Sequence, residues 1–196
     1  MNQAELRRML RSQRAAIDTP PHVRAAALVE QVLADVVIAG LPRGSWVACY
    51  ASYRNEPPTQ RLLQALNDAG FEVCVPAVHG HTLHWHDVTG EIDDPGAWGV
   101  DERGIPRPLT PAVATGAAEL MALGVRAIVT PALGLERTGA RVGQGGGFYD
   151  RLFGHLPRHI DGGPYRLGVT HVGGILPDGT IELQPHDEPV DAAIEA

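Results

Sequence analysis

The most informative part of this sequence is RAIVTPALGLERTGARVGQGGGFYDR, residues 126–151. It begins with RAIVTPAL, a continuous apolar run of strand length, and ends with RVGQGGGFYDR, in which four of the five residues 143–147 are glycine. Glycine loses more conformational freedom on folding than any other residue. A loop this rich in glycine is therefore either a disordered linker or a backbone that must lie against another group. With a helix predicted to begin near Gly147, the stretch predicts a strand, a glycine loop and a helix in succession.

Strands and helices alternate on both sides of this stretch. Apolar runs predict strands at 45–51, 71–77, 82–88 and 165–171, and spacing with capping and breaking residues predicts helices at 2–17, 19–40, 58–70 and 115–123. Residues 88–111 are predicted to be irregular and the tail from residue 184 to be extended. This order predicts an α/β fold with one domain, residues 1–196, built as a three-layer sandwich whose mostly parallel sheet has helices on both faces. Ligands bind at the carboxyl ends of the strands in such sheets, where the loops Tyr53–Thr59 and Gly134–Gly147 are expected.

Composition narrows the classes of function. The formal net charge of −7 disfavours nucleic acid as a partner, and neither a membrane span nor the apolar core of a signal peptide is found. Cys49 and Cys74 lie in apolar runs, as buried reduced thiols do, so we expect a cytoplasmic protein. All 16 basic side chains are arginine, which excludes a Walker A lysine and a lysine Schiff base. We expect a monomer that acts on small molecules.

The glycine loop predicts contact with phosphate. The spacing of Gly143, Gly145 and Gly147 does not match the G-x-G-x-x-G fingerprint of dinucleotide-binding folds, although the strand–turn–helix context keeps a nucleotide-dependent oxidoreductase open. Successive glycine amides can form an anion-binding nest at the start of a helix. Arg141 and Arg151 would add bidentate contacts to phosphate oxygens. A purely structural turn is the alternative.

We assign no binding site to two other clusters, one of histidines and one of arginines. The histidines between residues 79 and 86 lack an acid or cysteine at a spacing that completes a closed metal site, so surface histidines are expected. The arginines between residues 7 and 14 follow the solvated side of an amphipathic helix, from which at most Arg7 and Arg14 are expected to turn toward a ligand.

The loop RVGQGGGFYDR resembles the signature of the 5-formyltetrahydrofolate cyclo-ligases, also called methenyltetrahydrofolate synthetases, whose loop has the form R-(L/V)-G-x-G-x-G-(F/Y)-Y-D-R. Further matches follow in the family's order over nearly the whole chain. They are Leu6-Arg7 with Arg14 in the N-terminal helix, Glu56 and Thr59 in an E-x-x-T turn, PGAWGV at 95–100, the strand before the glycine loop, and PHDEPVD at 185–191.

The resemblance implies the ATP- and Mg²⁺-dependent cyclisation of 5-formyltetrahydrofolate to 5,10-methenyltetrahydrofolate, with release of ADP and phosphate. Such chemistry needs positioning and charge neutralisation more than a protein nucleophile, a role the resemblance gives to Arg141, Gly145, Gly146 and Gly147. It implies that ATP is bound by Gln3, Arg7, Arg14, Arg141, Val142, Gly143, Gln144, Gly145, Gly146, Gly147, Phe148 and Tyr149. It implies that the folate is bound by Ala51, Glu56, Trp98, Gln144, Gly145, Gly146, Gly147 and Phe148. The implied Mg²⁺ ligands are Asp150 and Asp187.

Some residues depart from the family's pattern or allow a second interpretation. Gln3 stands where the family usually has lysine, and Glu136 stands where an aspartate follows the strand. Without the resemblance, Glu56 also fits a solvated loop charge, Trp98 a buried core residue, and Asp150 an acid that complements a helix dipole. The missing lysine keeps open a nucleotide- or folate-binding regulatory protein without turnover.

Overall fold

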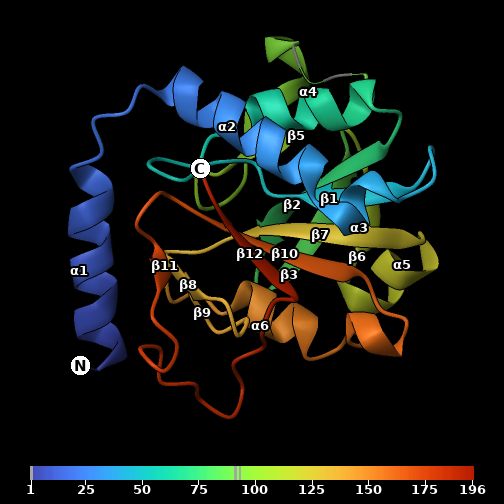
Figure 1. The fold of residues 1–196 in the computed structure, drawn as a ribbon. Helices are drawn as coiled ribbons and strands as arrows, with labels where there is room; N and C mark the ends of the chain where they lie inside the picture. The colour runs from blue at the N-terminus through green and yellow to red at the C-terminus, as the bar shows by residue number, and fades with distance from the viewer. Residues whose placement is uncertain (1, 91, 93) are drawn as a thin grey trace.

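The computed structural model describes residues 2–90, 92 and 94–196. Their central sheet has seven strands in the order β12-β10-β7-β1-β2-β3-β6 (Figure 1). The strands are β1 (Trp46–Cys49), β2 (Glu72–His79), β3 (Thr82–Asp87), β6 (Ala112–Thr115), β7 (Val125–Pro131), β10 (Tyr165–Thr170) and β12 (Ala192–Glu195). β1 is parallel to β2 and β7, and β10 is parallel to β7 and β12, whereas β3 is antiparallel to β2 and β6. The prediction of a mostly parallel sheet is confirmed.

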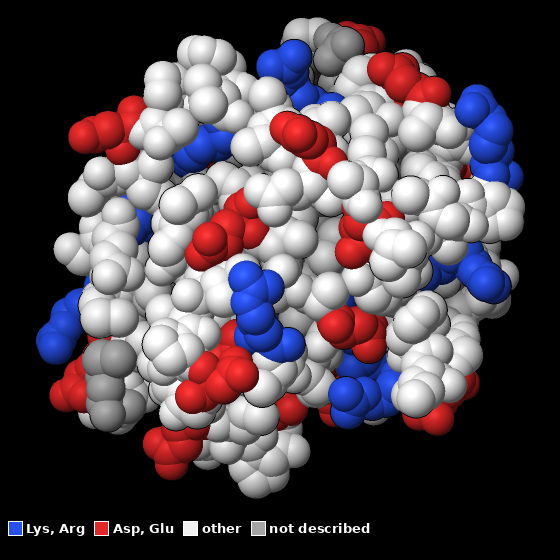
Figure 2. Space-filling view, viewed as in Figure 1, with Lys and Arg blue, Asp and Glu red and all other residues white. Residues whose placement is uncertain are grey.

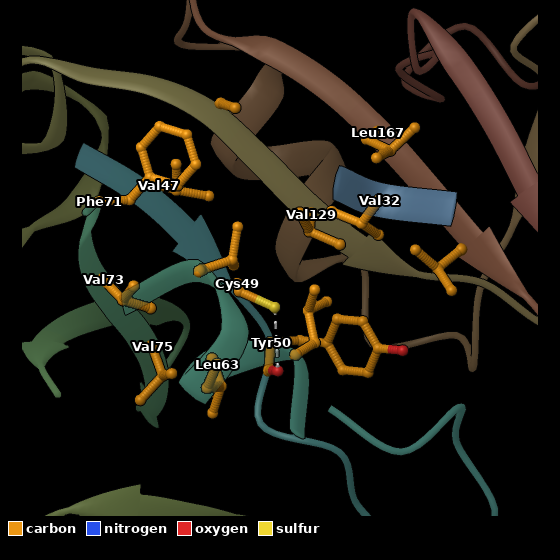
Figure 3. Packing of buried hydrophobic residues seen from close by; sticks show 14 of the residues in the cluster. Val32, Val47, Cys49, Tyr50, Leu63, Phe71, Val73, Val75, Val129 and Leu167 are labelled. Carbon is orange, nitrogen blue, oxygen red and sulfur yellow. Dashed lines mark hydrogen bonds between the residues drawn. The ribbon is translucent and has the colours of Figure 1, made fainter. Parts of the chain in front are cut away.

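Helices cover both faces of this sheet, as predicted (Figure 1). One face carries α2 (Pro21–Ala34), α3 (Val36–Ala39) and α4 (Gln60–Asp68), and the other carries α5 (Gly116–Ala122) and α6 (Phe148–Phe153). Successive residues of β1 enter the two cores in turn: Val47 and Cys49 pack with α2 and α4, and Ala48 packs with α5 and α6. Figure 3 shows the first core, where Val32 and Leu63 pack with residues of the strands. A strand buried on both faces must be apolar throughout, which explains the continuous apolar runs.

The two cysteines lie in opposite cores. Cys49 belongs to the core beneath α2 and α4, and Cys74 belongs to the core beneath α5 and α6. Both are free and fully buried. Burial raises the pKa of each thiol, so neither forms the reactive thiolate. The prediction of buried thiols is confirmed.

Asp35 divides the helix that was predicted at 19–40. Its side chain accepts hydrogen bonds from the N–H groups of Val37 (3.0 Å) and Ile38 (3.1 Å), and its backbone is extended. α2 therefore ends at Ala34, and α3 begins after a new N-cap. The prediction of one continuous helix was wrong because an aspartate inside the pattern caps a second helix.

Smaller elements surround the central sheet. The segment that was predicted to be irregular contains η1 (Pro95–Ala97) and a two-stranded antiparallel sheet of β4 (Trp98–Val100) and β5 (Pro106–Pro108). A third sheet has the order β11-β8-β9 and is formed by β11 (Ile175–Leu176), β8 (Gly134–Glu136) and β9 (Arg141–Val142). A short turn, η2 (His159–Asp161), follows α6.

α1 (Gln3–Ala15) stands beside the third sheet, apart from the helices that cover the central sheet (Figure 1). Asn2 and Glu5 form a capping box at its start. Leu6 and Leu10 pack into a small cluster with Leu133, Ala140, Val142 and Ile181. This apolar face fixes α1 and leaves its arginines free to face other elements.

The surface view in Figure 2 shows acidic and basic side chains interspersed over one face of the molecule. Among the described residues, we find no helix that combines the length and the apolar character needed to cross a membrane.

Candidate functional site

A cavity of about 900 Å³ opens at the carboxyl ends of β1 and β7. Tyr50 and Ala51 follow β1, and Ala132 and Leu133 follow β7; all four line the cavity. The remaining walls come from α1, the turn after β1, the strands β2 and β3, the segment after β4, the glycine loop with the start of α6, and the segment before β12. The cavity therefore lies at the sheet edge that the alternation of strands and helices predicted.

Three arginines of α1 face the cavity because their spacing places them on one side of the helix. Arg7, Arg11 and Arg14 are four and three residues apart and all line the cavity. Arg7 Nε donates to the carbonyl oxygen of Gly143 at 3.1 Å, and Arg11 donates to the Oε1 and the carbonyl oxygen of Gln144, both at 3.0 Å. α1 is thereby attached to the glycine loop through guanidinium groups that also face the cavity.

Arg14 and Glu56 attract each other electrostatically at the cavity wall. Burial raises the pKa of Glu56, against the opposing effects of the Tyr53 N–H and the Arg14 charge. Arg14 Nη2 donates to the carbonyl oxygen of Ala132 at 2.6 Å, and the Tyr53 N–H donates to Glu56 Oε2 at 2.9 Å. No described residue forms an ion pair with Glu56 within 4.0 Å. Its carboxylate can therefore accept hydrogen bonds from a ligand.

The turn that carries Glu56 is closed by two reciprocal hydrogen bonds. The Ser52 N–H donates to Thr59 Oγ1 at 2.8 Å, and the Thr59 N–H donates to Ser52 Oγ at 3.2 Å. Thr59 is fully buried. This pairing gives a structural reason for threonine three residues after Glu56, since it fixes the turn that presents the carboxylate.

The glycine loop exposes unpaired backbone donors to the cavity. Within the described ranges, the N–H groups of residues 144–147 make no hydrogen bond to the protein. Gly145 and Gly147 have φ values of 100° and 64°, which favour glycine. α6 has only six residues, so we assign the capacity to bind anions to these amides and the nearby arginines rather than to the helix. The loop can hold an anion with several oxygens.

Asp150 and Asp187 are carboxylates at the cavity, from α6 and from the segment before β12. Asp150 Oδ1 accepts hydrogen bonds from Arg141 Nη2 and from the Glu188 N–H. Asp187 Oδ2 accepts from the Gln184 N–H at 2.7 Å. No group of three or more His, Cys, Asp and Glu side chains suited to a metal occurs among the described residues. Two carboxylates with hard oxygen donors nonetheless fit Mg²⁺, which keeps several waters and shares phosphate oxygens.

Arg166 of β10 links the elements that carry these two carboxylates. It is buried, with 1% of its surface exposed. Its Nη2 donates to the carbonyl oxygens of Phe153 and Leu156 near the end of α6, at 3.1 and 3.0 Å. Its Nη1 pairs with Glu188 Oε2 at 3.2 Å, one residue after Asp187. A single guanidinium thus fixes α6 against the segment that contains Asp187.

The family of this chain is identified by a match over its whole length. The model of the 5-formyltetrahydrofolate cyclo-ligase family matches residues 1–196. The chain belongs to this family. The 5-formyltetrahydrofolate cyclo-ligase of Mycolicibacterium smegmatis is 29% identical over 153 residues, which cover 66% of this chain and 73% of that protein. The mitochondrial 5-formyltetrahydrofolate cyclo-ligase of Arabidopsis thaliana is 33% identical over 73 residues, which cover 34% of this chain and 25% of that protein.

Two solved structures share the cyclo-ligase fold with this chain. The NMR structure of the Aquifex aeolicus 5,10-methenyltetrahydrofolate synthetase has a TM-score of 0.71 at 24% identity, over all of this chain and 90% of that one. The 5,10-methenyltetrahydrofolate synthetase of Mycoplasma pneumoniae has a TM-score of 0.64 at 18% identity, over 99% of this chain and 98% of that one. The family resemblance that the motifs indicated is therefore confirmed.

The cyclo-ligase fold brings most of the predicted site residues to one cavity. Its lining includes Gln3, Arg7, Arg14, Ala51, Glu56, Arg141, Gly143, Gln144, Gly145, Gly146, Gly147, Phe148, Tyr149, Asp150 and Asp187. Val142 is instead buried beneath α1. Trp98 packs against the core that contains Val47 and does not line the cavity, so the expectation that it borders the folate has no support from its position.

Several residues that line the cavity were not predicted. Arg11 was expected on the solvated side of α1, but it reaches the glycine loop; its spacing from Arg7 and Arg14 was an available signal. Arg54 and Arg103 lie on loops whose approach to the cavity depends on tertiary packing.

The segment in which surface histidines were expected contains one contact between two histidine rings. The ring centroids of His79 and His84 lie 4.7 Å apart.

Proposed function

We propose that this chain catalyses the ATP- and Mg²⁺-dependent cyclisation of 5-formyltetrahydrofolate to 5,10-methenyltetrahydrofolate, with release of ADP and phosphate. One observation carries the proposal: the cavity combines a wall of arginines and unpaired loop amides with the half-buried carboxylate of Glu56 on another wall, in a chain of the cyclo-ligase family. The first wall suits a polyanion, and the second suits a ligand that presents N–H groups.

The triphosphate of ATP is the polyanion that fits the first wall. Among the described residues, none accepts a hydrogen bond from the N–H groups of residues 144–147. Arg7 and Arg11 line the same cavity. Guanidinium groups bind phosphate oxygens in a bidentate manner, and preorganised amides stabilise negative charge without reorganisation. Arg141, which is buried beside the loop, adds a third cation.

The pterin ring of the folate fits the wall that contains Glu56. The amino group and an adjacent ring N–H of a pterin donate in parallel, and a carboxylate is the side chain that accepts two parallel donors. Ala51 lies close by in the lining, and its small side chain leaves room for a flat ring. Phe148 and residues 144–147 border both substrates in this arrangement.

The proposed reaction needs two steps. In the first, the formyl oxygen attacks the γ-phosphorus of ATP; the O–P bond forms, the bond to the β–γ bridging oxygen breaks, and ADP leaves. In the second, the folate nitrogen N10 attacks the activated formyl carbon, the C–O bond breaks, phosphate leaves and N10 loses its proton. The protein's contribution is to hold the reacting atoms together and to neutralise charge on the phosphoryl group. Arg7, Arg11, Arg141 and the loop amides perform that role.

Asp150 and Asp187 would hold Mg²⁺ at the phosphate end of the cavity. The ion would supply additional neutralisation of phosphate charge when it is bound. Around it, Arg141 and the Glu188 N–H orient Asp150, and Gln3 and the Gln184 N–H orient Asp187.

We further propose that the chain acts as a monomer in the cytoplasm. The two buried thiols are unpaired, which suits a reducing compartment.

The test is to mix the purified protein with Mg²⁺, ATP and 5-formyltetrahydrofolate and to follow the absorbance of the conjugated methenyl product. Product that depends on both ATP and Mg²⁺ would support the proposal. Binding of both substrates without product would indicate a regulatory protein that has lost turnover. Oxidation of a nicotinamide cofactor without methenyl product would indicate an oxidoreductase.

A further inference from the structure

Two arginines at the cavity, Arg54 and Arg103, have no role in the arrangement above. Neither guanidinium forms a hydrogen bond or an ion pair with any residue in the described ranges. Each lies over an aromatic ring: Arg54 Cζ is 4.9 Å from the ring centroid of Tyr53, and Arg103 Cζ is 4.7 Å from that of Phe148. Stacking holds the planar group by its face and leaves its N–H edge open to an acceptor.

The turn that carries Arg103 is anchored to the central sheet. Asp101 is buried, and its Oδ1 accepts hydrogen bonds from the N–H groups of Arg103 (2.8 Å) and Ile105 (2.9 Å). Its Oδ2 accepts from the N–H of Val78 in β2 at 2.9 Å. One carboxylate therefore shapes the turn and fixes it to a strand, so the backbone that presents Arg103 has a defined position.

The turn that carries Arg54 is held in an unfavourable conformation. Arg54 has a φ of 54° and is the one non-glycine residue with a positive φ in the part of the chain that the structure describes. Such a conformation persists only where the surroundings hold it, and here Glu56 Oε2 accepts the N–H of Tyr53. The two turns approach each other: a Cβ atom on Gly104 would lie 3.7 Å from the Tyr53 hydroxyl oxygen. Arg54 and Arg103 thus belong to adjoining parts of the cavity rim.

We propose that Arg103, assisted by Arg54, forms a carboxylate-binding subsite that recognises the glutamyl end of the folate. The inference rests on the proposed function, because it names the part of the same substrate that these arginines contact. The glutamyl group carries the negative charge of a folate, and planar guanidinium groups match carboxylates in a bidentate manner. Phe148, on which Arg103 stacks, is a lining residue that the proposed function places beside the folate.

The phosphates of ATP are the other anions that an arginine here could recognise. Arg7 and Arg11 are attached to the glycine loop, and Arg141 is paired with Asp150 beside it. The Arg103 guanidinium lies over the ring of Phe148 at this wall, and its turn is anchored to β2 on another side of the cavity. This placement favours the carboxylate over the triphosphate.

The test compares two substrates: 5-formyltetrahydrofolate and its glutamyl diamide, in which both carboxylates are replaced by neutral carboxamides. KM values for both, and for ATP, are measured with the wild-type protein and with Arg103→Gln, Arg54→Gln and Arg107→Gln. Arg107 is a matched control, since it lies four residues after Arg103 and does not line the cavity. For an exposed charged contact we expect Arg103→Gln to raise the KM for 5-formyltetrahydrofolate about three- to tenfold, with a smaller rise for Arg54→Gln. The KM values for the diamide and for ATP should stay unchanged, as should all values of the control.

Three results would overturn the inference. An equal rise in KM for both folate substrates would mean that Arg103 only supports Phe148. A rise in the KM for ATP alone would mean that Arg103 contacts phosphate, and no change at all would mean that it contacts neither substrate. These results differ from a failure of the proposed function, in which the wild-type protein would form no methenyl product from either substrate.

Discussion

Gln3 Nε2 donates a hydrogen bond of 3.2 Å to Asp187 Oδ2, across 184 positions of the sequence. The same Nε2 donates to the carbonyl oxygen of Glu182 at 2.9 Å, and Gln3 Oε1 accepts a hydrogen bond from Arg7 Nη2 at 2.6 Å. The start of α1 is therefore tied to the segment that carries a proposed Mg²⁺ ligand. Where the family usually has a lysine, this chain has an amide that joins an arginine to a carboxylate.

Gln3→Lys is expected to weaken the response to Mg²⁺. The new ammonium group would pair with Asp187 and would repel the guanidinium of Arg7, so the carboxylate would be less available to the metal. We expect the Mg²⁺ concentration for half-maximal activity to rise about three- to tenfold, as for a partly exposed ion pair. Initial rates across a Mg²⁺ series measure this, with Gln3→Met as the uncharged control. A fall in the KM for ATP with an unchanged Mg²⁺ requirement would show that the lysine position contacts phosphate directly.

Arg11→Ala and Arg8→Ala form a matched pair on α1. Arg11 lines the cavity and bonds to Gln144, whereas Arg8 lies outside the cavity. Loss of Arg11 should raise the KM for ATP about three- to tenfold at low salt and less at high salt, because exposed charges are screened. Arg8→Ala should behave like the wild type. Equal effects of the two substitutions would mean that only the net charge of α1 matters.

Asp150→Asn and Asp187→Asn should both raise the Mg²⁺ requirement at least about tenfold, because each removes a charged oxygen ligand. Their effects on stability should differ. Asp150 pairs with Arg141, which is 8% exposed, so Asp150→Asn leaves a buried cation unpaired and should cost about 1–3 kcal/mol in the free energy of unfolding. Asp187 has no arginine partner among the described residues, so its variant should unfold like the wild type. Denaturant unfolding and Mg²⁺ titration of both variants check this, and a normal Mg²⁺ requirement in both would remove the two carboxylates from the metal site.

Folate binding should depend on the ionisation of Glu56. Burial raises the pKa of Glu56 above its ordinary value, so its carboxylate takes up a proton at a higher pH than an exposed glutamate does. The protonated form loses an acceptor for the pterin N–H groups, and the Kd for 5-formyltetrahydrofolate should rise as the pH falls through this raised pKa. The stability of the free protein changes in the opposite direction. Protonation removes the charge of a half-buried carboxylate whose pKa is raised in the folded state, so the free energy of unfolding rises as the pH falls.

Glu56→Gln is the variant that checks this dependence. The amide keeps the size of the side chain, cannot titrate and has one acceptor fewer. We expect weaker folate binding at neutral pH, a Kd that no longer depends on Glu56 ionisation, and unchanged ATP binding, all measured by titration calorimetry between about pH 5 and 8. Equal losses of folate and ATP affinity would indicate a collapsed turn instead of a lost pterin contact.

The sequence predicted those features that local chemistry determines. The apolar run of β1 predicted a strand buried on both faces, because Val47 and Ala48 must enter different cores. The positive φ angles of Gly145 and Gly147 fit the predicted loop, whose backbone was expected to lie against another group. The break at Asp35 was missed because an aspartate inside a helical pattern caps a new helix only when its backbone leaves the helix.

The rest of the site depends on contacts between segments far apart in the sequence. Nothing in the N-terminal helix indicates that Gln3 meets Asp187, since that contact follows from the packing of Leu6 and Leu10 beneath α1. The family motif at 95–100 suggested that Trp98 borders the folate, but the structure packs it against the core. Tertiary packing alone decides which side of such a motif faces the cavity.

In the proposed reaction, the cavity directs the formyl oxygen of the folate to the γ-phosphorus of ATP. Isotope transfer tests this step: 5-formyltetrahydrofolate labelled with ¹⁸O in the formyl group is mixed with the wild-type protein, Mg²⁺ and unlabelled ATP, and the released phosphate is examined by mass spectrometry. We expect one ¹⁸O atom in the phosphate for each methenyl product formed. Unlabelled phosphate, with the label released into water, would rule out attack by the formyl oxygen.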